Sequence, residues 1–331
     1  MKKSIIKSTG MFVPPNLITN HDLEKIIDTS HEWIVQRTGI EQRYWIDPKG
    51  TTGASDLGFE ASKMALENAG WAAQDLDFII FATLSPDIMF PGSGCLLQAK
   101  LGLDSTPALD IRQQCTGFLY GLATADAYIK SGLANKILLV GGEVHSSGLD
   151  KTTRGRDVTV IFGDGAAAVW IEGVETKKSA GLLSSSLHAD GNLADALMTE
   201  LPASRLQCRF PKDIPVDDPR YFPVMDGPAI FKKAVRFLPK VINESLKKAQ
   251  IDLDEIDLII PHQANMRINQ ALGQFLKLDD NKIFHNIQKY GNTTAASIPI
   301  ALHEAMERGR IGKSGDIVLF TGLGAGLTWG S

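Results

Sequence analysis

Three residues that can cooperate in thioester chemistry stand far apart in the chain: Cys115, His262 and Asn292. A thiol can form a covalent acyl intermediate, while an imidazole and a carboxamide can donate hydrogen bonds to an oxygen on which negative charge develops. Cys95, Cys208 and the other six of the seven histidines are expected to be ordinary structural residues. The three residues together predict a shared active site in which Cys115 is the nucleophile.

Cys115 lies in the segment Gln113-Gln114-Cys115-Thr116-Gly117, between a strand-like approach and a helical pattern. Free backbone N–H groups and the positive end of a helix would then lie beside the sulfur, and both favour the thiolate. A cysteine taken alone is more often a small core residue. The prediction of a nucleophile therefore depends on its partners.

The two partners each have an ordinary alternative. His262 follows the apolar run 259–261, at the end of a predicted strand, where a histidine can face a cleft or be purely structural. Asn292 follows Gly291, and an asparagine there is common in turns and helix caps. Their shared position at the ends of elements is what favours a site.

An internal repeat supports that shared position. The segment 77–80 resembles 257–260, and glycines and apolar residues of 132–142 return in 312–322, both 180 residues apart. At this separation His262 corresponds to Ala82, and Ala295 corresponds to Cys115. Two related halves would bring their strand and helix ends to one place, which is a natural position for a ligand site.

The elements of each half are typical of an α/β protein. Continuous apolar runs at 78–81, 137–140 and 317–320 predict strands covered on both faces. Helical patterns run over 56–68, before Gly70, and over 117–130, before Gly132. We predict a first half over residues 1–175, with the cysteine, and a second over 176–331, with the histidine and asparagine.

A proline-rich segment interrupts this order at about 199–228. Proline at this density opposes both helices and central strands, so the segment is predicted to be a long irregular excursion and a candidate cover for the site.

The composition is that of an ordinary soluble globular chain. Of the 331 residues 44% are hydrophobic and 22% charged, with a net charge of −4, which argues against nucleic-acid binding as the main function. The N-terminus has no apolar core typical of a signal peptide, and no apolar run is long enough to span a bilayer. From the absence of both features we expect a cytoplasmic protein. Because no two cysteines have metal-ligand spacing, we also expect no metal site.

Six motifs, in order along the chain, resemble those of the β-ketoacyl-[acyl-carrier-protein] synthase III group of the thiolase superfamily. They include Cys115-Thr116-Gly117-Phe118, Pro261-His262-Gln263-Ala264-Asn265, Gly291-Asn292-Thr293-Thr294 and the segments 33–40, 161–166 and 327–331. The resemblance covers essentially the whole length. It implies a thiolase-like fold of two βαβαβ-type halves in five αβαβα layers, and a homodimer.

The resemblance also implies a reaction. Cys115 would be acylated by an acyl-coenzyme A, and a malonyl group on acyl carrier protein would then lose carbon dioxide and attack the acyl-enzyme. His262 and Asn292 would hold the malonyl thioester oxygen, and the backbone N–H groups of Cys115 and Ala325 would hold the oxyanion of acyl transfer. The products would be a 3-oxoacyl-carrier, coenzyme A and carbon dioxide, in fatty acid biosynthesis, with no cofactor beyond the thioester substrate.

Further roles are carried over by the same resemblance. Trp33 would stack on adenine, and Arg37 and Arg154 would bind phosphates. Phe231, Ala264 and Asn265 would line the pantetheine channel. Gln263 and Arg267 would bind the carrier protein, and Phe90 would close the acyl tunnel of the dimer partner, a bulky ring that suggests a short acyl primer.

Three alternatives remain open at this stage. The chain could be a specialised synthase or acyltransferase acting on longer or unusual acyl thioesters in secondary metabolism. A cysteine hydrolase would also use Cys, His and Asn, although it would explain neither the repeat nor the glycine turns. An inactive acyl-carrier-binding homologue would not need all three residues.

Overall fold

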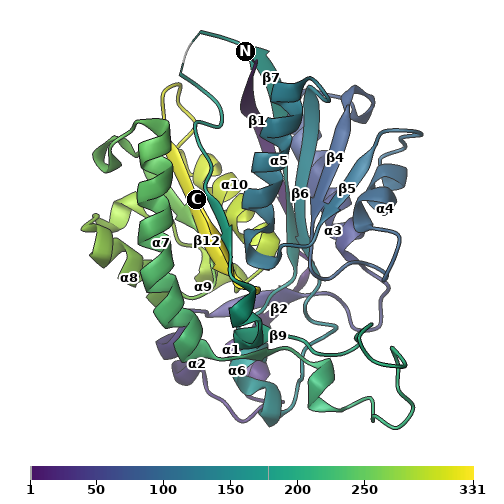
Figure 1. The fold of residues 1–331 in the computed structure, drawn as a ribbon. Helices are drawn as coiled ribbons and strands as arrows, with labels where there is room; N and C mark the ends of the chain where they lie inside the picture. Colours follow the sequence, from purple (N-terminus) through teal and green to yellow (C-terminus); the bar gives the residue numbers. More distant parts are fainter. Residues whose placement is uncertain (1, 178) are drawn as a thin grey trace.

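The computed structural model describes residues 2–177 and 179–331, and most of its strands form two sheets (Figure 1). The first sheet has the order β1 (Lys2–Phe12), β7 (Gly165–Glu175), β6 (Lys136–Glu143), β4 (Phe78–Ala82) and β5 (Ala108–Ile111). Its strands β4, β5 and β6 are parallel, while β7 runs antiparallel to both β6 and β1. This sheet belongs to the first half of the chain.

The second sheet is built from the second half. Its order is β11 (Leu258–Pro261), β12 (Val318–Gly324), β13 (Thr328–Gly330) and β8 (Leu187–Ala189). The strands β11 and β12 are parallel, as β4 and β6 are in the first sheet. Two small ladders complete the strands: β2 (Asn16–Thr19) with β3 (Gln42–Trp45), and β9 (Leu197–Met198) with β10 (Val224–Met225).

Helices separate and cover the sheets. The central pair is α5 (Gly117–Ser131) and α10 (Ser297–Glu307); the outer helices are α3 (Ala54–Ala69) and α4 (Ser93–Lys100) on one side and α7 (Gly227–Ala249) and α8 (Met266–Leu276) on the other. Three short helices lie near the lower end of the view in Figure 1: α1 (Asn20–Leu23), α2 (His31–Thr38) and α6 (Arg156–Thr159). A fourth, α9 (Ile287–Tyr290), lies above them. The predicted α/β class is confirmed.

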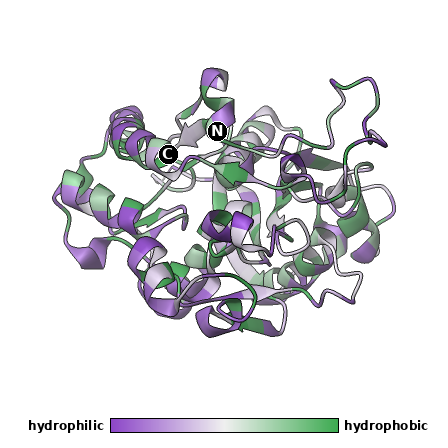
Figure 2. Cartoon of the chain, turned by 90° about the horizontal axis from the view of Figure 1, so that it is seen from below, coloured by the Kyte–Doolittle hydropathy of each residue, from purple (hydrophilic) through white to green (hydrophobic). Residues whose placement is uncertain are grey.

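The buried clusters follow these layers. One cluster joins α5 and α10 to the inner faces of both sheets through residues such as Phe118, Ile298 and Ile260. A second packs α3 and α4 against the outer face of the first sheet, and a third packs α7 and α8 against the second sheet. Figure 2 shows hydrophilic residues concentrated on the peripheral helices and loops. The layers therefore read αβαβα, as expected for a thiolase-like fold.

The internal repeat is visible in the backbone. The helices α3 and α7 both end at a left-handed residue, Gly70 and Gln250, which are 180 residues apart. Gln114 (φ 45°) and Thr294 (φ 47°), also 180 apart, precede α5 and α10 with the same left-handed conformation. A positive φ is uncommon in a non-glycine residue, so this coincidence marks one turn present in both halves.

The segment 199–228 is largely irregular, as predicted, apart from a short 3₁₀ turn at Pro219–Tyr221 and the β10 strand. Its base is closed by the ladder in which Val224 pairs with Met198 and Met225 with Leu197. In the chain as described, no helix combines the length and the apolar character needed to cross a membrane.

Candidate active site

The three residues singled out in the sequence meet at one cavity. Cys115, His262 and Asn292 line a space of about 80 Å³, and all three are buried, with exposed fractions of 5%, 4% and 5%. They come from the start of α5, the end of β11 and the turn before α10. Both halves of the chain therefore contribute to a single enclosed site.

The setting of Cys115 follows the prediction, but its acidity does not. Its own backbone N–H and that of Ala325 act to lower the pKa of the thiol, and α5 begins two residues later. Burial nevertheless raises the pKa of the Cys115 thiol to about 12, and the buried carboxylate of Glu143 adds to the rise. The N–H groups act in the predicted direction, but desolvation outweighs them and favours the neutral thiol.

Gly324 leaves room for the nucleophile. A Cβ at this position would lie 2.6 Å from the Cβ of Cys115 and 3.1 Å from its sulfur. Because α5 and β12 hold both backbones, neither residue can move away without disturbing its element. Gly324 is therefore required for close approach of β12 to the cysteine.

We expect Gly324→Ala to lower the rate of Cys115 acylation at least about tenfold and to destabilise the fold by roughly 1–3 kcal/mol through overpacking. Acylation followed by mass spectrometry and thermal unfolding would measure the two effects. Gly191→Ala is the matched control, because a Cβ there meets nothing within 4 Å. Wild-type acylation in the Gly324 variant would contradict the proposed crowding.

His262 is held so that one ring nitrogen faces the cavity. Its Nδ1 lies 2.6 Å from the hydroxyl oxygen of Ser297, while its Nε2 is buried and has no hydrogen-bond partner in the described part of the chain. Burial lowers the pKa of His262 to about 3, so the imidazole is neutral. The Ser297 hydroxyl can donate to Nδ1, and in that arrangement the single ring proton lies on Nε2, where it is free to donate to a ligand.

Asn292 is oriented in a similar way. Its Oδ1 accepts the N–H of Thr294 at 2.8 Å, which leaves the amide NH₂ group as the end available to a ligand. Its own N–H donates to the carbonyl of Ile161, and its carbonyl accepts from Gly163. Two neutral donors, one imidazole and one carboxamide, are therefore fixed around the cavity.

The structure adds three polar residues that the sequence analysis did not single out: His145, Glu143 and Thr294. The Nε2 of His145 lies 2.7 Å from the Thr294 hydroxyl, and both residues are buried. Glu143 is fully buried, and its pKa is raised to about 7 by desolvation. The internal repeat could have pointed to His145, because this residue lies 180 positions before Ala325, which was expected to supply a backbone N–H to the oxyanion.

The aromatic and basic residues expected to bind coenzyme A are only partly brought together. The guanidinium carbon of Arg37 lies 4.4 Å from the centroid of the Trp33 ring, and that of Arg156 lies 4.7 Å from it. Arg154 instead contacts the carboxylate of Asp150 and the ring of Phe222. Arg156, which the sequence analysis passed over, therefore occupies the position beside Trp33.

The residues expected along the pantetheine channel all line the small cavity: Phe231, Ala264 and Asn265. Phe231 is partly exposed, as a residue at a cavity mouth would be. Asn265 also has a structural task, because its side chain caps α8 and donates to the carbonyl of Arg37. That bond ties α2 to the start of α8.

The two residues expected to bind a carrier protein differ in their surroundings. Arg267 is exposed on the first turn of α8. Gln263 is only 1% exposed, and its amide bonds the backbone of Pro261, Phe284 and Asn286. The prediction that Gln263 contacts a carrier protein directly is therefore wrong, because its side-chain amide is buried and hydrogen-bonded within the fold.

Phe90 lies outside the small cavity of its own chain. It is 80% exposed, beside Ile88 and Met89, which are also exposed. Among the described residues it is absent from the lining of the cavity around Cys115. Any role for Phe90 at an acyl site thus needs a second subunit.

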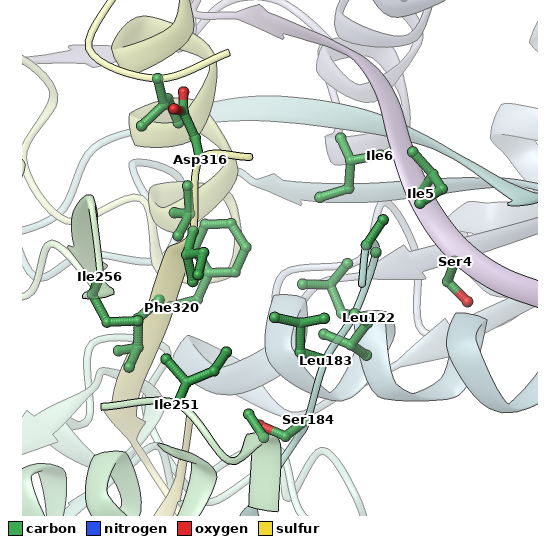
Figure 3. Close-up of a pocket in the computed structure, with 18 of the residues that line it drawn as sticks. Ser4, Ile5, Ile6, Leu122, Leu183, Ser184, Ile251, Ile256, Asp316 and Phe320 are labelled. Carbon is green, nitrogen blue, oxygen red and sulfur yellow. The ribbon is translucent and has the colours of Figure 1, made fainter. Parts of the chain in front are cut away.

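A second, larger cavity of about 1010 Å³ lies between the halves (Figure 3). Its labelled lining includes Ile5 and Leu122 from the first half and Ile251 and Phe320 from the second. Neither Cys115, His262 nor Asn292 is part of its lining. We place the chemistry in the smaller cavity despite the difference in volume, since only there do a nucleophile and two free donors converge.

Comparison with known proteins agrees with this geometry. The family model described as 3-Oxoacyl-[acyl-carrier-protein (ACP)] synthase III matches residues 109–191, and the model of its C-terminal part matches residues 246–331. Beta-ketoacyl-[acyl-carrier-protein] synthase III of Aquifex aeolicus (strain VF5) is 43% identical over 98% of this chain and 97% of its own length.

Solved structures give the same result. The crystal structure of 3-oxoacyl-[acyl-carrier-protein] synthase III from Aquifex aeolicus VF5 has a TM-score of 0.88 and 42% identity, covering 100% of this chain and 98% of that one. The corresponding protein from Pseudomonas aeruginosa PAO1 has a TM-score of 0.88 and 34% identity, covering 99% and 96% of the two chains. These similarities span both halves and all three residues of the site.

Proposed function

This chain belongs to the 3-oxoacyl-[acyl-carrier-protein] synthase III family, and from that premise we propose that Cys115 carries the acyl group while His262 and Asn292 activate the malonyl substrate. The chain is a 3-oxoacyl-[acyl-carrier-protein] synthase III, an acyltransferase of fatty acid biosynthesis. Identity over nearly the full length does not favour the specialised synthase considered above. The observation that carries the residue assignment is the convergence of one thiol and two free neutral donors on one buried cavity.

In the first step, the Cys115 sulfur attacks the carbonyl of an acyl-coenzyme A. A new carbon–sulfur bond forms, the bond to the coenzyme A sulfur breaks, and the proton of the Cys115 thiol ends on the released coenzyme A. The backbone N–H groups of Cys115 and Ala325, which act to lower the pKa of the thiol, would stabilise the tetrahedral oxyanion. Because the thiol pKa is raised, these fixed donors matter most as charge develops.

In the second step, the malonyl group of a malonyl-carrier loses carbon dioxide. The electron pair of the broken carbon–carbon bond forms an enolate, whose oxygen accepts from Nε2 of His262 and the amide of Asn292. The enolate carbon then attacks the acyl-Cys115 carbonyl, and the Cys115–acyl bond breaks to give the 3-oxoacyl-carrier and a Cys115 thiolate, which takes up a proton from water. Neutral donors suit this step, since they stabilise a developing charge without a prior proton transfer.

The remaining assignments complete the proposal. Acyl-coenzyme A would bind along Phe231, Ala264 and Asn265 with its nucleotide end near Trp33, Arg37 and Arg156, which lie together. An acidic carrier protein would meet Arg267 on the exposed face of α8. A cytoplasmic homodimer, with Phe90 of each chain at the acyl site of the other, would cover the exposed side chains of Ile88, Met89 and Phe90. No cofactor besides the thioester substrates is needed.

The decisive experiment is a mass measurement on the acyl-enzyme. Incubation with acetyl-coenzyme A, and separately with longer acyl-coenzyme A species, should add one acyl mass, which peptide mapping should assign to Cys115. The Cys95→Ala/Cys208→Ala double variant is the control, because both cysteines are exposed and lie outside the cavity. Acylation on Cys95 or Cys208, or none at all, would contradict the proposal.

A further inference from the structure

We propose that Thr116 and Thr328 are positioning residues for acyl transfer. Their hydroxyls join the turn that carries Cys115 to the turn that carries Ala325, and so fix the two backbone N–H groups at which the tetrahedral oxyanion would form. This inference rests on the proposed roles of Cys115 and Ala325. Neither threonine is among the described residues that line the cavity around Cys115, so both act through the backbone beside it.

The two N–H groups belong to different halves of the chain. Cys115 lies in the 3₁₀ turn Gln114–Thr116, which leads into α5. Ala325 follows the last residue of β12 and begins the short turn 325–327, after which β13 starts at Thr328. The distance between the two N–H groups therefore depends on how the two turns are held against each other.

The two turns lie in close contact at the end of β12. A Cβ on Gly324 would lie 3.0 Å from the backbone nitrogen of Cys115 and 2.6 Å from its Cβ. Ala325 is the next residue, so the two backbones that would supply the N–H groups are neighbours. A misplacement of about 1 Å in a catalytic site can cost about 10²-fold in rate, so this contact needs to be fixed.

A pair of buried hydroxyls joins the two turns. Oγ1 of Thr116 lies 2.8 Å from Oγ1 of Thr328, and the two residues are 0% and 3% exposed. The Thr116 hydroxyl also lies 2.9 Å from the carbonyl oxygen of Gln113, and the Thr328 hydroxyl lies 3.3 Å from the carbonyl oxygen of Ala325. This series of contacts runs from the backbone before Cys115 to the backbone of Ala325.

The hydroxyl protons allow two arrangements, because each hydroxyl has one proton to donate and can also accept. Thr328 can donate to Thr116 while Thr116 donates to the carbonyl of Gln113. Alternatively, Thr116 can donate to Thr328 while Thr328 donates to the carbonyl of Ala325. The hydroxyl–hydroxyl bond is present in both arrangements, so either one connects the two turns.

Thr116 stands where a threonine commonly has a different task. It is the N-cap residue of α5, and an N-cap hydroxyl usually accepts a hydrogen bond from an N–H of the first helical turn. The side chain of Thr116 makes no such bond to the helix. Its hydroxyl contacts Gln113 and Thr328 instead, and thus serves the contact between the two halves.

The turn 325–327 is also held within the second half. The N–H of Leu327 donates to the carbonyl of Asp190 at 3.0 Å, and the N–H of Asp190 donates to the carbonyl of Leu327 at 2.8 Å. The Leu327 side chain is fully buried. With the turn fixed in its own half, the bond between Thr116 and Thr328 connects it to the half that carries the nucleophile.

The test compares two reactions of the Cys115 sulfur in the full chain carrying Cys95→Ala and Cys208→Ala. Acylation by acetyl-coenzyme A passes through an oxyanion, whereas alkylation by iodoacetamide does not. Thr116→Val and Thr328→Val each remove a hydroxyl and nearly keep the side-chain shape. We expect each to slow acylation by roughly 10- to 100-fold, less than the loss of about 10²–10³-fold for an oxyanion donor removed outright, and to leave alkylation within about threefold of the parent.

Three further variants act as controls. Thr116→Ser and Thr328→Ser keep the hydroxyl, so both reactions should stay close to those of the parent. Thr124→Val removes another hydroxyl of α5, which donates to the carbonyl of Tyr120 within the helix at 2.8 Å, and should change neither reaction.

A double variant tests whether the two threonines act through one bond. Thr116→Val/Thr328→Val should lose no more in acylation than the larger single loss, because both changes remove the same contact. Losses that multiply would overturn the proposal, as would a parallel fall of alkylation and acylation in a valine variant that still folds. Thermal unfolding identifies the folded variants, and if one valine variant unfolds, the other valine variant and its serine counterpart carry the comparison.

The outcome is separable from that of the proposed function. A parent that acetyl-coenzyme A does not acylate, as measured by mass spectrometry, would sink the role of Cys115. A parent that is acylated, with folded valine variants acylated at the same rate, would sink the role of Thr116 and Thr328 alone.

Discussion

Replacement of Cys115 by alanine is expected to abolish 3-oxoacyl product formation, with a loss of at least about a thousandfold, while decarboxylation of a malonyl thioester remains measurable. The reason is the proposed separation of tasks in the cavity: in this mechanism the sulfur carries the acyl group, and His262 and Asn292 stabilise the enolate. Product formation is followed by mass spectrometry of the carrier, and decarboxylation by release of labelled carbon dioxide.

The control for this variant is Cys208→Ala, which removes an exposed cysteine and should leave both half-reactions intact. Product formation by Cys115→Ala within about tenfold of wild type would show that the acyl group is carried elsewhere or transferred directly. Loss of decarboxylation together with condensation, in a variant that still folds, would instead show that the two tasks are not separate.

Replacement of His262 by alanine is expected to give the opposite pattern. Decarboxylation should fall by about 10²–10³-fold, the cost of one donor to a developing oxyanion, while acylation of Cys115 by acyl-coenzyme A continues. In the wild-type enzyme this step should show no inflection from His262 between about pH 5 and 9, because burial disfavours the charged imidazole and lowers its pKa to about 3. Acylation and decarboxylation are measured separately across this range.

The matched control is His21→Ala, because the side chain of His21 is largely exposed and lies outside the cavity. A decarboxylation rate in His262→Ala close to that of wild type would remove His262 from the second step. A loss of activity as His262 titrates near neutral pH would show that it acts as an acid or base, and not as a neutral donor.

Much of this site was predictable because the repeat constrains it. Cys115, His262 and Asn292 stand at the ends of elements whose apolar runs and glycine stops are clear in the sequence, and duplication places those ends together. The helix ends at Gly70 and Gly132 were likewise visible, since glycine adopts the left-handed conformation at low cost.

The contacts between distant side chains were not predictable in the same way. Arg154 and Arg156 are two residues apart on neighbouring turns, and only the path of the chain after Asp150 decides which guanidinium reaches Trp33. Gln263 follows His262 in a polar segment that would be expected to be exposed, yet its side-chain amide hydrogen-bonds buried backbone groups. The sequence shows the residue types. Which side chain meets which partner depends on the buried polar groups that still need a hydrogen bond once the chain has folded.

The acidity of Cys115 was mispredicted for a related reason. A helix start and free N–H groups are local features that a sequence can show. The desolvation of the sulfur and the proximity of Glu143 arise from tertiary packing, which buries both residues at the same place. The local features predicted the position of Cys115 beside a helix start correctly. They favour a lowered pKa of its thiol, whereas burial raises that pKa.

The left-handed turn found before both α5 and α10 has a consequence for how duplicated enzymes diverge. In the first half the residue after the turn is the nucleophile, whereas in the second half that place is taken by Ala295. The second copy kept the strained backbone although it has no sulfur to present. Its conformation persists where the N–H of Thr294 donates to Oδ1 of Asn292 and the Thr294 hydroxyl lies beside Nε2 of His145. One turn therefore places the thiol, and the other orients the carboxamide that faces it across the cavity.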